Sequence, residues 1–163
     1  MARQAAIADL GLSKCEQDFL EVVIQQMPIV ADLSRADLLL YTQKNPQELL
    51  ILFHAQPHSL AHVYNRGRTE RLIPAESRPE IVETLARGTV RRDQRSIITE
   101  GAPVVRETLP VYYPPNDHPH ARPRDNRDAP AAPRVVAALV IVTNLIEHER
   151  HKFRSEVYRR ELS

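Results

Sequence analysis

The sequence has little of several features that commonly reveal a protein's chemistry. Its 163 residues contain one cysteine, four glycines and no tryptophan. A lone cysteine, Cys15, excludes an internal disulfide and any paired-cysteine redox or metal centre. No stretch approaches the roughly 18 apolar residues needed to cross a bilayer, and the charged start lacks the apolar core of a secretory signal. We therefore expect a soluble, cytoplasmic protein with no membrane span, stabilised by packing alone.

Net charge is also nearly absent. The chain has 22 basic and 21 acidic side chains, which give +1 at neutral pH. This balance provides no general attraction to nucleic acid or to an anionic membrane. A Walker-type glycine loop, a GxSxG elbow and a CxxC pair are all missing. We expect a non-enzymatic chain with no catalytic residue and no certain cofactor, although an unknown small-molecule ligand stays open.

The first predicted element is a helix over residues 12–27. Ser13 lies three residues before Glu16, the spacing of a capping box in which each side chain binds the other residue's backbone N–H. Apolar residues including Cys15 then recur at helical spacing. Proline lacks the N–H that a helix interior requires, so we expect the helix to stop or kink at Pro28.

The middle of the chain predicts a sheet with one covering helix. Two apolar runs, 36–41 and 48–55, are separated by a short polar turn and predict a β-hairpin. Residues 60–64 resemble a third strand. Residues 74–88 have helical periodicity between prolines and a terminal glycine, and residues 104–113 return to a strand pattern.

The last third changes composition twice. Residues 114–133 are rich in proline and charge and predict a flexible loop. Residues 135–143 are the most apolar in the chain and predict a central strand, within a sheet region that covers 36–113 and 134–144. The charged tail 145–162 predicts a C-terminal helix. The whole, 1–163, is interpreted as one α+β domain: an antiparallel sheet of about five to six strands, flanked by amphipathic N- and C-terminal helices.

Histidines supply the only candidates for metal chemistry. Three of them, at 54, 58 and 62, are spaced every four residues, but Pro57 interrupts the run and favours strands and a turn over an aligned metal-binding face. His118 and His120, beside Asp117, could bind zinc, nickel or copper weakly in the proline-rich loop. We favour a solvated loop, and expect no metal. His148 and His151 lack an acceptor-box context and are interpreted as surface residues.

Several segments resemble the amino-terminal sensor domain of bacterial two-component histidine kinases. They are ADLSRADLLLYTQ, ELLILFHAQP, RPEIVETLARGT, LPVYYP and RVVAALVIVTNL, which together extend over roughly residues 30–145. The chain departs from the family pattern in lacking an arginine before the proline of AQP, and in the long loop 114–133. The resemblance implies a GAF-like fold, related to PAS, and transfers no catalytic residue.

What the resemblance implies about function is a regulatory input domain. A ligand, or a change in dimer packing, would bias the terminal helices and pass the signal to a downstream ATP-dependent kinase domain and then to a response regulator. Homodimerisation through the terminal helices is expected. Position alone suggests six ligand-binding residues: Tyr41, His54, His62, Tyr64, Arg106 and Tyr112. The alternatives are a small enzyme or metal-binding protein that uses the histidine-rich segments, and a scaffold that only dimerises.

Overall fold

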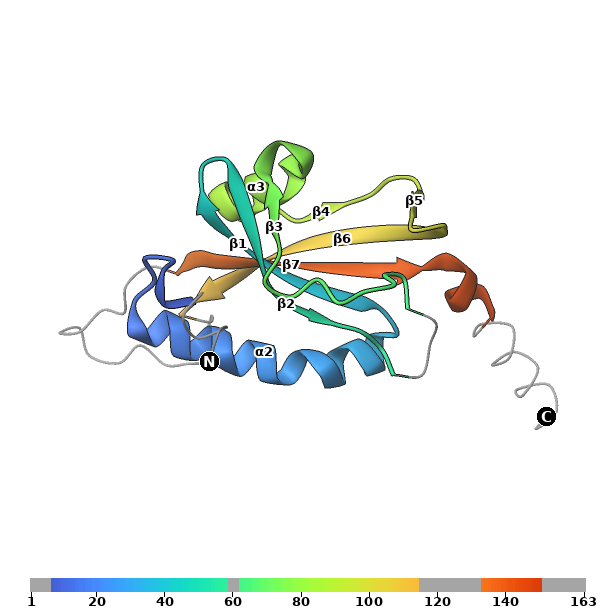
Figure 1. Ribbon diagram of the computed structural model, residues 1–163, viewed down its shortest axis with the longest axis horizontal. Coiled ribbons are helices and arrows are strands. Elements are labelled where there is room, and N and C mark those ends of the chain that lie inside the picture. Colours follow the sequence, from blue (N-terminus) through green and yellow to red (C-terminus); the bar gives the residue numbers. More distant parts are fainter. Residues whose placement is uncertain (1–6, 59–61, 115–132, 151–163) are drawn as a thin grey trace, which may run out of the picture.

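The computed structural model describes residues 7–58, 62–114 and 133–150. Its centre is one antiparallel sheet with the strand order β3-β2-β1-β7-β6-β4, and β5 pairs with β6 off this path. Helix α2 crosses one face of the sheet, and α3 lies on the other (Figure 1). The strands are β1 (Asp37–Asn45), β2 (Glu48–Ala55), β3 (Leu72–Pro74), β4 (Arg91–Arg92), β5 (Ile97–Thr99), β6 (Ala102–Tyr113) and β7 (Arg134–Asn144).

The sheet is larger than the sequence indicates. Seven strands form instead of five or six. The sequence does not reveal β4 and β5, because they pair with β6 over only two and three residues, too few to show periodicity. The predicted hairpin is confirmed as β1 and β2. The apolar segment 135–143 is confirmed as the centre of β7, which pairs with β1 on one side and β6 on the other.

Helix α2 (Lys14–Ser34) confirms the predicted capping box. The Ser13 N–H donates to the Glu16 carboxylate at 2.8 Å, and the Glu16 N–H donates to the Ser13 hydroxyl at 3.3 Å. The expected stop at Pro28 is wrong, because the helix continues to Ser34 and ends at Arg35 in the left-handed conformation. The buried face formed by Ile24, Met27 and Ala31 passes through the proline, so packing against the sheet outweighs the missing hydrogen bond.

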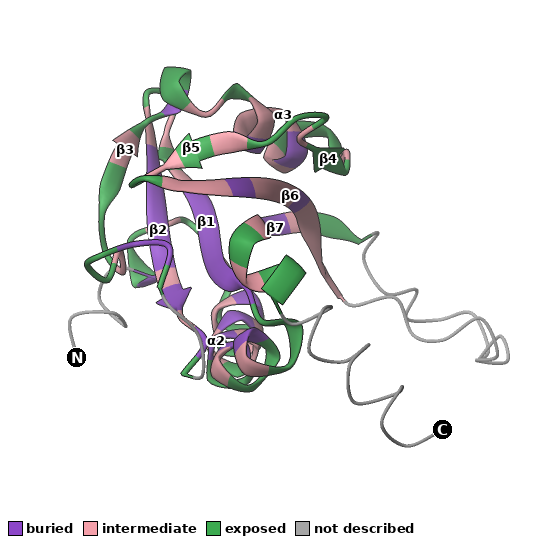
Figure 2. Ribbon diagram, turned by 90° about the vertical axis from the view of Figure 1, so that its right-hand side faces the viewer, coloured by how far each residue is buried: buried purple, intermediate pink, exposed green. Residues whose placement is uncertain are grey.

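Alternation along the strands divides the core into two layers. In β1, Leu38 and Leu40 belong to the cluster beneath α2, whereas Leu39 and Tyr41 belong to the cluster beneath α3. A period of two places successive side chains on opposite faces, so a strand covered on both faces is apolar throughout. Figure 2 shows this as long buried stretches in β1 and β2. The three-layer arrangement explains why the central strands have no polar face.

The predicted helix 74–88 divides in two. A short 3₁₀ turn, η1 (Ala75–Ser77), precedes α3 (Pro79–Arg87), and Gly88 ends α3 with φ of 68°. Proline at the first position and glycine after the last follow the usual asymmetry of helix ends. Between β2 and β3, residues 62–71 lie along β2 as an irregular segment, joined to it by backbone hydrogen bonds between Ile51 and both Glu70 and Arg71.

One predicted strand is wrong, and Cys15 of the predicted apolar stripe is not buried. The predicted strand over residues 60–64 is wrong in its described part, because residues 62–64 form no strand and Val63 and Tyr64 lie in a bend. The Tyr64 carbonyl accepts from the Gln56 side chain, and the strand that pairs with β2 here is β3. Cys15 is exposed, since α2 packs through the opposite side of the helix.

Residues 145–150 are helical, as predicted. The rest of the predicted C-terminal helix, most of the predicted 114–133 loop, His118, His120 and His151 lie outside the described residues. Within the described ranges, no helix is long and apolar enough to cross a membrane.

Candidate functional site

The most polar part of the core lies on the α3 side of the sheet, around His54 and Asp37. Leu40 pairs with Phe53 and Tyr41 with Ile51, so β2 carries one extra residue at Leu52. Strict alternation would place His54 on the α2 side, with Leu52. After the bulge, each side chain of β2 lies on the face of the sheet opposite to the one that strict alternation predicts. The His54 side chain therefore lies on the α3 side. There its Nε2 lies 3.0 Å from Asp37 Oδ2, with the two side chains 0% and 1% exposed.

The tautomer of His54 follows from its second hydrogen bond. The backbone N–H of Arg68 donates to His54 Nδ1 at 3.2 Å, so Nδ1 carries no proton and the Nε2–H donates to Asp37. The His54 backbone N–H in turn donates to the Thr69 hydroxyl at 3.0 Å. His54 therefore holds the 62–71 segment against β2, and Asp37 fixes the ring.

Tyr64 closes the space above His54. The two rings meet edge to face, with centroids 5.2 Å apart. The Arg68 guanidinium lies 4.4 Å from the centre of the Tyr64 ring and also pairs with Glu100. Burial raises the pKa of Tyr64 to about 12, so its hydroxyl stays protonated at any physiological pH.

A second arginine approaches the same space from the start of α3. Arg78 lies 5.7 Å from the centre of the Tyr41 ring and donates from Nε to Glu80 at 2.6 Å. Burial raises the pKa of Tyr41 as well. Arg78 Nη2 and Arg68 Nε are buried and have no acceptor among the described residues. A buried donor without a partner costs about 1–3 kcal/mol, so these two N–H groups indicate where an acceptor would be favoured.

Arg106 joins this group only through a shared carboxylate. Its Nη1 lies 3.6 Å from Glu80, and its Nε lies 2.9 Å from Asp93. The remaining two predicted residues lie apart. His62 is exposed, and the Tyr112 hydroxyl donates to the Gly88 carbonyl at 3.3 Å, at the far end of α3. The structure thus brings together Tyr41, His54 and Tyr64, attaches Arg106 at the edge, and separates His62 and Tyr112.

Sequence reasoning missed three residues of this group: Asp37, Arg68 and Arg78. Asp37 had a detectable signal, because a carboxylate within an apolar strand requires a buried partner. Arg68 and Arg78 had none, since arginines in a loop and at a helix start are ordinarily solvated. We call Asp37, Tyr41, His54, Tyr64, Arg68 and Arg78 the core polar cluster.

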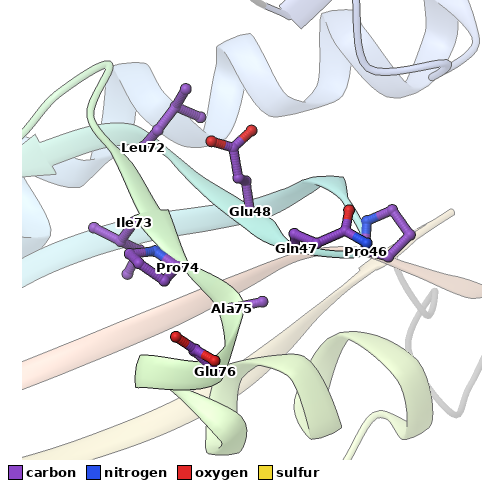
Figure 3. Close-up of a pocket in the computed structure, with 8 residues that line it drawn as sticks. All are labelled: Pro46, Gln47, Glu48, Leu72, Ile73, Pro74, Ala75 and Glu76. Atoms are coloured by element: carbon purple, nitrogen blue, oxygen red, sulfur yellow. The ribbon is translucent and has the colours of Figure 1, made fainter.

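A separate pocket lies at the edge of the sheet and contains none of the predicted site residues. Its volume is about 480 Å³, and it is lined by the β1–β2 turn, β3 and η1. Figure 3 shows the side chains of Glu48 and Glu76 at its sides. Glu48 accepts from the Asn45 amide at 2.8 Å. The residues that line the pocket offer no cationic group.

The histidines do not assemble a metal centre within the described part of the chain, where no group of three or more His, Cys, Asp or Glu residues could hold an ion. As predicted, the run at 54, 58 and 62 does not form a helix face. His54 is in β2, and His58 pairs with Asp32 of α2 at 2.9 Å on the surface.

A comparison with known protein families identifies the family of this domain. The family model described as the GAF domain of histidine kinase PdtaS matches residues 6–116, more than half of the chain. The chain belongs to this GAF family. A sensor or input role follows for the domain, in agreement with the resemblance noted in the sequence. No curated protein matches the chain.

The GAF domain also resembles a solved structure described as the sensor region of a sensor histidine kinase. The TM-score is 0.56 at 20% identity, and the match covers 85% of this chain and 41% of that one. At that identity the likeness shows the fold alone. The chain spans less than half the length of that sensor region.

Proposed function

We propose that this GAF domain is the cytoplasmic sensory input of a two-component histidine kinase, and that catalysis resides in other parts of the kinase. The family match over residues 6–116 supports this proposal. A single exposed cysteine is consistent with a reducing compartment. The kinase and, through it, a response regulator are the proposed partners, and the domain acts as a homodimer.

The proposed sensing element is the core polar cluster beneath residues 62–71. Its leftover donors, Arg68 Nε and Arg78 Nη2, are cationic and buried. The chemistry that satisfies such donors is a carboxylate or a phosphate, which accepts charge-assisted hydrogen bonds. The adjoining Tyr41 and Tyr64 rings offer aromatic contact to the rest of the molecule. We infer a small anionic ligand that enters when the 62–71 segment lifts from β2.

The proposed route to the kinase is short. Asp37, the base of the cluster, pairs across the sheet with Val142 of β7. Two residues further along, the Asn144 side chain accepts from the backbone N–H groups of Ile146 and Glu147 at 3.0 and 3.4 Å, and so caps the C-terminal helix. Because no loop separates β7 from this helix, a shift of the strand moves the start of the helix with it.

A thermal-shift experiment tests the ligand class. The chain is heated with inorganic phosphate, aliphatic and aromatic carboxylates, and mono- and dinucleotides, beside an Arg78→Met variant and an exposed control, Arg150→Met. Binding to the folded state stabilises it by RT ln(1 + [L]/Kd), so the melting temperature rises with ligand concentration. We expect at least one anion to stabilise the wild type and the control but not Arg78→Met. An equal rise in all three proteins, or no rise with any anion, would contradict the proposed site.

A further inference from the structure

The β5–β6 hairpin contacts the segment that covers the core polar cluster. Glu100 lies at the tip of this hairpin, and its two carboxylate oxygens accept from two groups of residues 62–71. One oxygen accepts from the Asn65 backbone N–H at 2.7 Å, and the other accepts from the Arg68 guanidinium. The hydrogen bonds from Asn65 and from Arg68 lower the pKa of Glu100, so this side chain is a carboxylate at neutral pH. A negative charge on the hairpin therefore holds the 62–71 segment at two points.

The turn at Glu100 uses a residue that the backbone does not favour. Thr99 pairs with Ala102, so Glu100 and Gly101 form a two-residue hairpin loop, and their φ angles are 46° and 85°. Two positive φ angles are the pattern of a type I′ turn, whose first central position prefers asparagine, aspartate or glycine. Glutamate is disfavoured there, because its Cβ crowds the backbone in the left-handed region. The contacts of the carboxylate with residues 62–71 offset this cost and account for a glutamate at the tip.

Arg68 is shared between the hairpin and the interior of the cluster. Its Nη2 donates to Glu100, and its guanidinium lies 4.4 Å from the centre of the Tyr64 ring. Its Nε is buried and has no acceptor among the described residues. An anion that reaches this Nε has to share the guanidinium with the Glu100 carboxylate, and two negative charges beside one cation repel each other. Glu100 and an anionic ligand therefore compete for the same arginine.

We propose that Glu100 holds residues 62–71 closed over the core polar cluster, and that an anionic ligand displaces its carboxylate from Arg68. We call this contact the Glu100 latch. The inference rests on the proposed anion site and adds its regulation, because binding then requires the latch to open. Arg68 exchanges one carboxylate for another acceptor, so the gain from binding comes from the buried donors that Glu100 leaves unpaired, Arg68 Nε and Arg78 Nη2.

The Glu100 latch lies close to the start of the C-terminal helix. Four residues after Glu100, Val104 of β6 pairs with Asn144 of β7, whose side chain caps that helix. The tip of the β5–β6 hairpin and the start of the helix lie at the same end of the sheet (Figure 1). Because β6 and β7 are hydrogen-bonded neighbours, release of the hairpin from residues 62–71 acts on the strand beside the cap. This gives the cluster a second route to the helix, besides the pairing of Asp37 with β7.

Backbone amide exchange without any ligand tests the latch itself. Glu100→Asn suits the type I′ turn, but its shorter side chain does not reach the two donors. We expect the amides of residues 62–71 to exchange about tenfold faster, as for loss of a charge-assisted hydrogen bond, while those of β1 and β7 keep their rates. Glu83→Gln is the matched control, because Glu83 pairs with Arg91 and is 31% exposed against 28% for Glu100. Unchanged exchange in Glu100→Asn, or equal acceleration in Glu83→Gln, overturns the proposal.

Titration with inorganic phosphate and with benzoate separates the latch from the anion site. Apparent affinity scales with the fraction of the protein that is open, so Glu100→Asn should bind at least one of these anions about tenfold more tightly than the wild type, the same factor as in the exchange measurement. Arg78→Met should bind neither anion. Equal affinity in the wild type and Glu100→Asn would overturn the competition at Arg68 and leave the anion site standing. Binding of neither anion to any variant would overturn the anion site, whereas the exchange rates would still decide whether the latch exists.

Discussion

The buried pair of Asp37 and His54 provides the most quantitative test of the core polar cluster. Because His54 Nδ1 accepts from the Arg68 N–H, the imidazole is neutral and donates from Nε2 to the Asp37 carboxyl group. Three substitutions probe it. Asp37→Asn keeps an acceptor for His54, Asp37→Ala removes it, and His54→Leu removes the donor and leaves the carboxylate in the core.

These three changes should destabilise the domain to different extents. Asp37→Asn exchanges a charge-assisted hydrogen bond for a neutral one, a loss of about 1 kcal/mol. Asp37→Ala strands the imidazole N–H, which costs about 1–3 kcal/mol. His54→Leu leaves the Asp37 carboxylate without the imidazole donor at a fully buried position, and such a loss costs more for a charged group than the cost of about 1–3 kcal/mol for a neutral one. The free energy of unfolding should fall in that order.

Urea denaturation followed by far-ultraviolet circular dichroism measures these losses, since the chain has no tryptophan for fluorescence. Asp18→Asn, which changes an exposed carboxylate paired with Lys14, is the matched control and should shift stability by less than about 0.5 kcal/mol. The slope against urea should stay constant, as expected if only stability changes. The assignment of charge and tautomer would be refuted if Asp37→Asn destabilised the domain as much as His54→Leu.

Three further measurements follow from the contacts described above. Hydrogen bonding to Arg134 lowers the pKa of Glu16 to about 2. The free energy of unfolding of the wild type should therefore fall by about 1–2 kcal/mol as pH falls from 4.5 to 2, a figure reduced for the exposure of Arg134. A Glu16→Gln variant with the same pH dependence in urea titrations would argue against this. Gly88→Ala combines a φ of 68° with a Cβ placed 2.2 Å from the Tyr112 hydroxyl, so we expect a loss of about 2–4 kcal/mol, partly restored by Tyr112→Phe, and no restoration would disprove the clash. The raised pKa of Tyr64, about 12 against 10 in the unfolded chain, predicts that stability falls by about 2–3 kcal/mol as pH rises from 10 to 12; Tyr64→Phe should flatten that part of the curve, and an unchanged curve would count against the burial of the hydroxyl.

Local sequence signals predicted most elements of the fold. The capping box at Ser13 marked the start of α2, and the apolar run 135–143 marked the central strand. The errors arose where tertiary packing decided the outcome. Pro28 ends a helix only if no buried face crosses it, and β4 is too short for any periodicity.

The candidate site was harder to predict than the fold. Tyr41 and Tyr64 were identified by residue type and position, but their meeting with His54 depends on the bulge at Leu52, which no alternation pattern reveals. The two arginines depend on where residues 62–71 and η1 fold back. Such long-range placement is set by the assembled sheet and not by neighbouring residues.

The central claim is that this domain regulates a kinase. The most direct measurement is the rate of autophosphorylation by the complete polypeptide that contains these residues, compared among the wild type, Tyr64→Phe, Arg78→Met and the control Arg150→Met. We predict that the two cluster variants change the rate severalfold while the KM for ATP stays constant, and that the control matches the wild type. Equal rates in all four folded proteins, or a complete polypeptide without kinase activity, would contradict the account.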